Sequence, residues 1–292
     1  MERSAAGENQ ASSRPQTQVI LLGSGTPYPD PTRSGPAVAV VVNGAAYLVD
    51  CGPGVVRRAE AAKEKGIAAL DVANLRIVFI THLHSDHTLG YPDLIFSPWV
   101  MHRETPLEAY GPRGLKSMTA HIEKAWQKDV FVRRHGLEEA NATGYKVEVH
   151  EVTPVIVYRD ANATVTAFAV KHGSWDQAFG YRFDTADRRV VISGDTAPSE
   201  EVIKACDGCD LLLHEVYNPH GEKLKKEPHE KEYFRTFHTS PEELGEIARR
   251  ARPKRLVLYH QVWMQLPEED LLEQMKKAYA GEWVSGLDLG VY

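Results

Sequence analysis

Four potential metal ligands fall within six consecutive positions of this chain: His82, His84, Asp86 and His87. They follow the apolar run Leu75–Ile80, which has the length and composition of a buried strand. Imidazole and carboxylate groups are the usual nitrogen and oxygen ligands of zinc. A strand interior would send alternate side chains to opposite faces, so groups this closely spaced converge only where the chain turns. A polar loop that holds three histidines by chance is disfavoured, because the HxHxDH spacing is specific. The pattern predicts a metal site at the end of a buried strand.

Several later apolar runs also end in histidine or an acid. A lone histidine at a strand end is more often a hydrogen-bonded structural residue, but here the same arrangement recurs and accompanies the HxHxDH motif. Active-site groups collect where strand ends converge, so these residues are expected to share one site. They are His172 after Thr164–Val170, Asp195 after Val190–Ile192, His214 and Glu215 after Leu211–Leu213, and His260 after Leu256–Tyr259.

Strand-like runs dominate early in the chain and alternate with helical patterns later, which predicts one α/β domain with layered sheets over residues 18–292. Asn43-Gly44 between two β-branched runs predicts a hairpin, and Ser240 to Glu243 has the form of a helix capping box. Residues 1–17 are polar and are expected to form a disordered tail, and the irregular stretch 91–163 is expected to hold an insertion or cap. Helices are predicted over Pro53–Lys65, Leu115–Gln127, Glu200–Cys206, Pro241–Arg250 and Glu268–Tyr279, and strands over Gln18–Leu22, Ala37–Val42, Ala45–Val49, Leu75–Ile80, Thr164–Val170, Ala178–Phe183, Arg189–Ile192, Asp210–Leu213 and Arg255–Tyr259.

Charge and cysteine content narrow the class of protein. The net charge is −6 with histidine neutral, whereas a protein that binds phosphate backbones usually carries the opposite sign. The chain has no apolar run of about 18 residues, the length that a membrane span needs.

Its three cysteines make no disulfide framework and fit a reducing compartment, so a cytoplasmic location is expected. We interpret Cys206 and Cys209 as a turn and a packed helix end, not as a metal or redox site.

Taken together, these motifs resemble the metallo-β-lactamase superfamily and, within it, the ribonuclease Z branch, with similarity also to arylsulfatase-type and phosphodiesterase-type members. The resemblance runs from about Val19 to His260. Besides HxHxDH it rests on Leu22-Gly23-Ser24-Gly25-Thr26-Pro27, Val49-Asp50-Cys51-Gly52, Pro106 to Pro112, Phe179-Gly180-Tyr181-Arg182, Ser193-Gly194-Asp195-Thr196, His214-Glu215 and Leu258-Tyr259-His260.

The resemblance implies a four-layered αββα sandwich with two zinc ions at one edge of its sheets, manganese and iron being alternatives. A hydroxide between the ions would be the nucleophile, because two zinc ions lower the pKa of a shared water. Asp50 resembles the family's carboxylate that orients metal ligands, although a turn aspartate explains it equally well. The implied ligands are His82, His84 and His172 for the first ion, Asp86, His87 and His260 for the second, and Asp195 as the bridge.

The resemblance also implies a proton donor to the leaving group. His238 and Glu215 match the family's histidine and glutamate pair, and a carboxylate beside an imidazole would orient it and favour its charged form. His238 also precedes a predicted helix, so it could instead cap that helix. The candidate catalytic residues are this pair, His238 and Glu215, together with Asp86 of the HxHxDH motif.

The chain departs from the family's tRNA-processing members in two places. Those members carry a long basic arm between the third histidine motif and the bridging aspartate, whereas His172 and Asp195 are only 23 positions apart here. Gln261-Val262-Trp263 follows His260 where those members have a Ser/Arg/Tyr pattern. Trp99, Trp126, Trp175 and Trp263 are candidates to line a pocket for a compact substrate, although a single tryptophan is more often core.

Three functions follow as hypotheses. The first is a zinc-dependent hydrolase of small phosphodiesters, sulfate esters, lactones or β-lactams, for which tRNA and membranes are not partners and a homodimer is suggested by the resemblance. The second is a tRNA 3′-end endonuclease that works without an arm. The third is a non-enzymatic metal-binding protein, which the complete set of seven candidate ligands disfavours.

Overall fold

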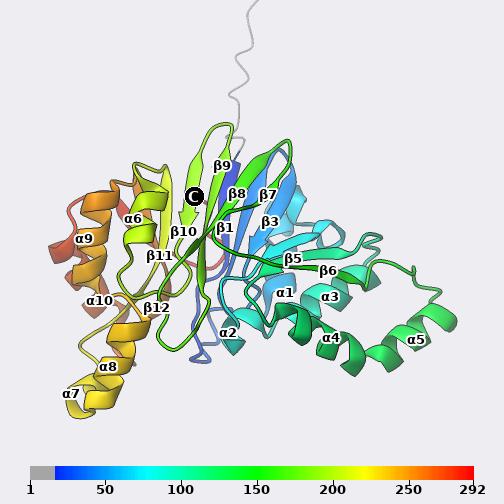
Figure 1. Ribbon diagram of the computed structural model, residues 1–292, viewed down its shortest axis with the longest axis horizontal. Helices are drawn as coiled ribbons and strands as arrows, with labels where there is room; N and C mark the ends of the chain where they lie inside the picture. Colours follow the sequence, from blue (N-terminus) through cyan, green and yellow to red (C-terminus); the bar gives the residue numbers. More distant parts are fainter. Residues whose placement is uncertain (1–16) are drawn as a thin grey trace, which may run out of the picture.

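Two mixed β-sheets lie face to face through the centre of the molecule, and helices cover the outer side of each (Figure 1). The computed structural model describes residues 17–292. The first sheet consists of β1 (Thr17–Gly23), β2 (Ala37–Val42), β3 (Ala45–Val49), β4 (Ile77–Phe79), β5 (Leu107–Gly111) and β6 (Val147–Glu151), in that order. The second consists of β7 (Ile156–Arg159), β8 (Ala163–Ala169), β9 (Phe179–Thr185), β10 (Arg189–Ile192), β11 (Leu211–Tyr217), β12 (Arg255–Val262) and β13 (Trp283–Ser285), also in chain order.

The helices fall into three sets. Beside the first sheet lie α1 (Val55–Glu64), α3 (Tyr91–Val100), α4 (Leu115–Ala125) and α5 (Gln127–His135), and beside the second lie α6 (Glu200–Cys206), α9 (Pro241–Ala251) and α10 (Glu268–Ala278) (Figure 1). The short helices α2 (Ser85–Thr88) and α7 (Glu222–Lys226), together with α8 (Pro228–Phe237), lie at the lower edge of the view. Single 3₁₀ turns occur at Ala68–Leu70 and Val72–Asn74. The expected four-layered αββα sandwich is confirmed.

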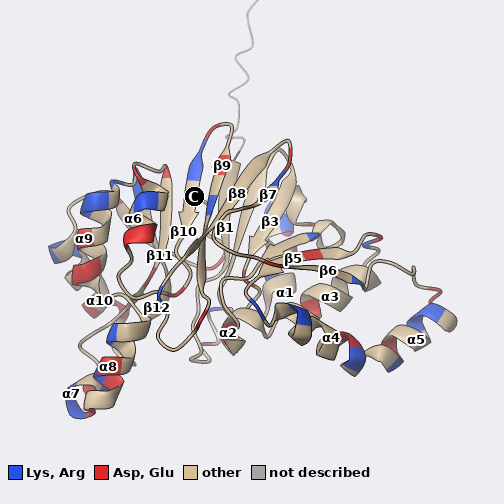
Figure 2. Cartoon of the chain, in the orientation of Figure 1, with Lys and Arg blue, Asp and Glu red and all other residues tan. Residues whose placement is uncertain are grey.

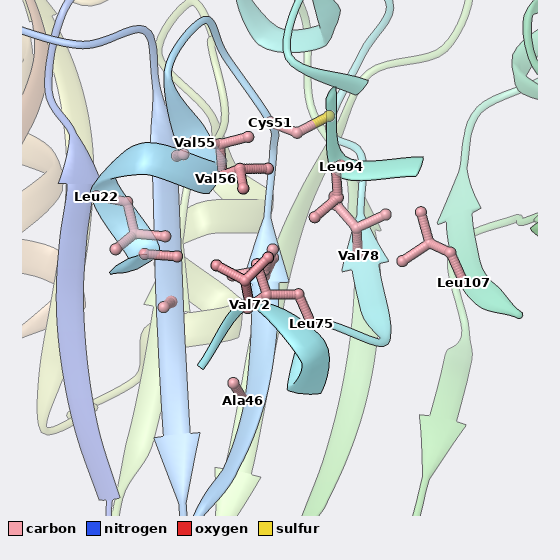
Figure 3. Close-up of a cluster of buried hydrophobic side chains, with 14 of the residues drawn as sticks. Leu22, Ala46, Cys51, Val55, Val56, Val72, Leu75, Val78, Leu94 and Leu107 are labelled. Atoms are coloured by element: carbon pink, nitrogen blue, oxygen red, sulfur yellow. The ribbon is translucent and has the colours of Figure 1, made fainter. Parts of the chain in front are cut away.

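Strand β1 shows how the layers are held together. Val19 and Leu21 pack between the two sheets, whereas Ile20 and Leu22 pack against the helices of the first sheet. Because side chains alternate along a strand, a strand that is buried on both faces has a continuous apolar sequence. Figure 3 shows the helix side of this arrangement, where α1 and α3 place Val55 and Leu94 over the strands.

Most predicted elements are present. The hairpin of β2 and β3 turns at Asn43 and Gly44, whose φ angles of 50° and 82° suit the turn that joins twisted strands. Helix α6 has the predicted bounds, and Ser240 and Glu243 form the predicted capping box of α9. The predicted helix over residues 115–127 is broken at Trp126, where α4 ends and α5 begins.

The stretch 91–163 differs from the expectation of an insertion or cap. It contributes β5 and β6 to the first sheet and β7 to the second, so it belongs to the sandwich itself. Strands β6 and β7 escaped prediction because they are short edge strands with no buried residue, so neither forms part of a continuous apolar run. Strand β1 begins at Thr17, one residue before the expected domain boundary, and the rest of the expected tail, residues 1–16, lies outside the described residues.

Cys206 and Cys209 are joined by a disulfide. Cys206 is the last residue of α6 and both sulfurs are buried, so the predicted helix end and turn are present, but the bond between them was not expected. A spacing of three residues does not by itself distinguish two packed thiols from a disulfide. Between residues 17 and 292, no helix combines the length and apolarity that crossing a membrane requires.

Candidate metal centre

The HxHxDH segment leaves the sheet as predicted, in a turn at the end of β4. His82 and His84 lie in the extended segment after the strand, and Asp86 and His87 lie in the short helix α2. The backbone of the neighbouring Gly52 packs so closely that a Cβ atom there would be 2.6 Å from the carbonyl oxygen of Asp86. The chain therefore turns against the loop after β3, and its polar side chains face the edge of the two sheets.

Three histidines and one aspartate form a first group. The Nε2 atom of His82 lies 2.9 Å from Nδ1 of His84, and Nε2 of His172 lies 3.1 Å from the same Nδ1. One ligand atom from each of these rings and one from Asp195 lie within 4.8 Å of one another. This group has the donor atoms and the size of a site for one divalent cation.

A second group lies beside the first and consists of Asp86, His87 and His260. The Oδ2 atom of Asp86 is 3.1 Å from Nε2 of His260 and 3.5 Å from Nε2 of His87. Strand β12, which pairs with β11 in the second sheet, brings His260 to this position. The two sheets thus contribute to one cluster of polar side chains.

Asp195 stands between the two groups. Its Oδ2 atom is 3.4 Å from Nε2 of His87, 3.5 Å from Nε2 of His260 and 4.0 Å from Nε2 of His172. The aspartate follows Gly194, whose φ of 62° and close approach to the carbonyl oxygen of Phe179 suit only glycine. A carboxylate in this position can serve cations on both sides.

Unsatisfied buried atoms show that this cluster fits metal ions. Among the described residues, Nε2 of His87 and Oδ1 of Asp195 are buried without a hydrogen-bond partner, which is costly unless another group binds them. Burial also lowers the pKa of His82, and it lowers the pKa of His172 to about 4, so both rings are neutral near pH 7. Neutral imidazole is the form that binds a metal. A pair of divalent cations would supply the missing partners.

Asp50 orients one of these rings. Its Oδ2 atom lies 2.8 Å from Nδ1 of His87, which leaves Nε2 of His87 directed toward Asp86 and Asp195. The backbone N–H of Thr81 donates to Oδ1 of Asp50 at 2.8 Å and holds the carboxylate in place. The position of Asp50 therefore matches that of a carboxylate that fixes a ligand from behind.

Two further contacts around the first group were not predicted. The indole N–H of Trp175 donates to Nε2 of His84 at 2.9 Å, so Nδ1 of that ring faces His82 and His172. Nδ1 of His172 lies 2.8 Å from the carbonyl oxygen of Phe237. The sequence signal for Trp175 was its place three positions after His172, whereas a backbone carbonyl leaves no signal. Of the other candidate tryptophans, Trp99 is core and Trp126 is exposed on the far side of the first sheet.

His238 and Glu215 also meet at the edge of this cluster. Nδ1 of His238 and Oε2 of Glu215 face each other at 3.4 Å, and Oε1 of Glu215 accepts the backbone N–H of Thr239 at 3.0 Å. A ligand atom of His238 lies within 4.8 Å of Asp195 and His260. Helix α9 is capped by Ser240, so His238 is not its cap.

The pKa directions of this pair differ from those that the sequence suggested. Burial lowers the pKa of His238 to about 4, and burial raises the pKa of Glu215 well above its ordinary range. Both directions favour a neutral carboxylic acid facing a neutral imidazole, not the charged pair that the sequence suggested. His214, the neighbour of Glu215, belongs to neither candidate metal group; its Nδ1 lies 2.7 Å from the carbonyl oxygen of Glu215.

Known proteins are similar to this chain in sequence and in fold. A model of the Beta-lactamase superfamily domain matches residues 46–261. Ribonuclease Z of Mycobacterium sp. strain KMS is 35% identical over 245 residues, which is 83% of each chain. Among solved structures, the metallo-beta-lactamase fold protein YhfI from Bacillus subtilis has a TM-score of 0.71 at 18% identity, covering 94% of this chain and 99% of its own. Human tRNase Z, short form, has a TM-score of 0.69 at 24% identity, covering 94% and 98%.

Proposed function

Because this chain belongs to the β-lactamase superfamily and to its ribonuclease Z-like branch, we propose that it is a binuclear metallo-hydrolase of small phosphodiesters. The observation that carries the proposal is the position of Asp195. One of its oxygens lies within 4.0 Å of histidines from both candidate metal groups. A shared carboxylate between two sets of histidine and aspartate donors is the arrangement that two neighbouring cations require.

The side chains of the site have two roles: most would bind the metal ions, and the rest would transfer protons. His82, His84 and His172 would hold one zinc ion, Asp86, His87 and His260 the other, and Asp195 both. Two ions bound there would polarise the phosphoryl group and activate water for attack. The ribonuclease name of the relatives supports a phosphodiester as the bond that is broken. Sulfate esters, lactones and β-lactams remain the next substrate classes to test.

His238 would donate the proton that the leaving group needs. Its Nδ1 faces Glu215, so its Nε2 is the atom directed to the cluster. Nδ1 of His238 and Oε2 of Glu215 are 3.4 Å apart and not hydrogen-bonded, so a protonated Glu215 would have to move closer to donate to Nδ1. That hydrogen bond would select the tautomer of His238 that carries its hydrogen on Nε2. The imidazole is then ready to protonate an alkoxide as the bond to phosphorus breaks.

A compact substrate is supported by what lies between His172 and Asp195. That interval holds a short loop and the hairpin of β9 and β10, so a long basic arm has no place in it. Along the helices drawn in Figure 2, lysine and arginine positions are interspersed with aspartate and glutamate positions. An extended polynucleotide gains affinity by displacing counterions from many phosphates, which needs basic groups along its path.

The second candidate is cleavage of precursor tRNA at its 3′ end. It is favoured by the relatives named ribonuclease Z, which include a Mycobacterium bovis protein that is 31% identical over 94% of this chain. The homodimer suggested by the family resemblance also stays a prediction, which sedimentation of the purified protein would test.

The experiment compares both substrates at equal enzyme, low salt and saturating zinc. We expect the purified protein to hydrolyse bis(p-nitrophenyl) phosphate and to leave precursor tRNA uncut, and chelated protein is the control. Efficient cleavage at the tRNA 3′ end would establish the second candidate instead. Two bound zinc ions with no turnover of any ester in a panel would contradict the hydrolase proposal itself.

A further inference from the structure

A cavity of about 600 Å³ lies beside the candidate metal centre, a volume typical of sites for small molecules. Its walls come from the loop Gly25–Arg33 after β1, from α7 and α8, and from Gln261–Leu266, which comprises the end of β12 and the residues after it. Helices α7 and α8 lie at the lower edge of Figure 1, where α2 also lies. None of the seven candidate metal ligands lines the cavity, so it is a space next to the metal centre and not the centre itself.

His238 lies near both the cluster and the cavity. Its ring is 5.3 Å from the ring of His172 and 6.1 Å from that of His260. The same ring is 5.5 Å from that of Phe234, which forms part of the cavity wall. The next residue after His260, Gln261, also lines the cavity. The cavity is therefore the space nearest to a group bonded to an atom that His238 protonates.

The wall combines polar and charged side chains with a group of apolar and aromatic ones. Phe234, Trp263 and Tyr28 line it together with Val262, Met264 and Leu266. Arg33 also lines it, but its guanidinium already stacks over Trp263 at 5.3 Å and pairs with Glu268 at 3.1 Å. That arginine is only 10% exposed, so it braces the wall and is not available to bind an anion.

The remaining charged groups of the wall are mostly acidic. Asp30, Glu222 and Glu230 line the cavity together with one further cation, Lys223. Both signs appear on α7 and α8 in Figure 2. Glu222 is already paired with Lys225 at 3.0 Å and with Lys226 at 3.4 Å. Asp30 and Glu230 against Lys223 leave no excess of positive charge in the wall, which disfavours a second phosphate in this space. The chemistry of the wall fits an uncharged, flat apolar group.

We propose that this cavity is the leaving-group subsite and that it selects esters with an uncharged aromatic or apolar alcohol. The inference rests on the proposed function, because it takes His238 as the proton donor. In the step, an oxygen of water forms a bond to phosphorus while the bond to the alcohol oxygen breaks. The electron pair of that bond stays on the alcohol oxygen, which takes its proton from Nε2 of His238 while Nδ1 of His238 takes the proton of Glu215. The imidazole therefore stays neutral, and a proton released by the attacking water restores Glu215. The alcohol is released from the cavity, and the phosphate monoester remains at the metal edge.

Methyl 2-naphthylmethyl phosphate tests the assignment, because it has two alkoxide leaving groups of unequal size. If the naphthylmethyl group occupies the cavity as the leaving group, zinc-loaded enzyme releases naphthylmethanol over methanol by more than about 10-fold, since burial of so large an apolar group is favourable. Methanol as the main alcohol would show that the cavity holds the group that is retained. Absence of cleavage at either bond by protein with two zinc ions would instead overturn the proposed function.

The variant Phe234→Ala removes one aromatic wall of the cavity. We expect it to lower the ratio of naphthylmethanol to methanol by about 3- to 10-fold, the range that an aromatic contact supplies. Phe131→Ala is the matched control, because Phe131 is 58% exposed on α5 and does not line the cavity. Calorimetric titration with 2-naphthalenemethanol gives a readout without turnover, and Phe234→Ala should weaken that binding by a similar factor. An unchanged ratio and an unchanged affinity in Phe234→Ala would overturn the assignment.

Discussion

The variant His238→Ala is expected to lose more activity on a substrate whose leaving group is more basic, because a basic leaving group must be protonated as its bond breaks. Removal of the imidazole takes away the only proposed donor on that side of the cluster and leaves the seven candidate metal ligands in place. A phosphodiester with an alkoxide leaving group must be protonated as its bond breaks, whereas p-nitrophenolate leaves as a stable anion. The loss should therefore be large for the first substrate and small for the second.

The structure sets the magnitude. A positioned general acid contributes about 100- to 10,000-fold to the rate. Nδ1 of His238 and Oε2 of Glu215 face each other at 3.4 Å without a hydrogen bond, so this carboxylate does not fix the ring. We therefore expect the lower part of that range, about 100- to 1,000-fold in kcat for an alkoxide, and less than about 10-fold for p-nitrophenolate. The variant Glu215→Gln should lose much less than Glu215→Leu, because an amide can still accept from Thr239 and donate to Nδ1.

The assay measures kcat for methyl p-nitrophenyl phosphate and for a dialkyl phosphate with zinc-loaded protein, alongside the zinc content of each variant. Equal losses for the two leaving groups would assign His238 a structural role. Loss of a zinc ion from His238→Ala would do the same, because the residue would then act through the metal centre.

Two other variants probe the surroundings of the site and the fold. Asp50→Asn should weaken zinc affinity by about 10- to 100-fold in a chelator competition, because the carboxylate that fixes His87 from behind is lost; unchanged affinity would make Asp50 a turn residue only. Asp160→Asn should lower the free energy of unfolding by about 0.5–1 kcal/mol at pH 7, since Asp160 accepts hydrogen bonds from Tyr47 and from backbone N–H of Ala163. Burial alone would raise the pKa of Asp160, but these bonds outweigh it and hold the pKa below the ordinary value, so the stabilisation is complete above about pH 4 and disappears as the pH falls through the lowered pKa. Denaturant titrations of both proteins at pH 7 and pH 3 measure this, and a difference that does not shrink at pH 3 would contradict it.

Local chemistry decided which parts of the molecule could be predicted from the sequence. The HxHxDH motif and the strand-end residues indicated one cluster because ligand type and strand polarity are both visible in the sequence. The hairpin at Asn43-Gly44 was predictable for a similar reason, since few residues tolerate the left-handed backbone of that turn. The assignment of these side chains to two zinc ions stays a prediction.

Other parts depend on contacts that no local pattern encodes. The α7–α8 hairpin gave no core signal, because α8 has no buried residue and its aromatic rings face the cavity and the metal centre. The protonation of His238 and Glu215 follows from the burial of both groups, which only the packed structure shows. The hydrogen bond from Trp175 to His84 joins a loop of the second sheet to the end of β4 across 91 positions of sequence.

The metal content of the wild-type protein and of Asp195→Ala tests the central proposal most directly. We expect elemental analysis to find two zinc ions per chain after reconstitution of the wild type. Hydrolysis of bis(p-nitrophenyl) phosphate should depend on those ions. In Asp195→Ala each group loses its shared carboxylate, so zinc content should fall and hydrolysis should be lost. A wild-type protein that binds at most one ion, or an Asp195→Ala variant that keeps both ions and near-normal turnover, would contradict a binuclear centre bridged by Asp195.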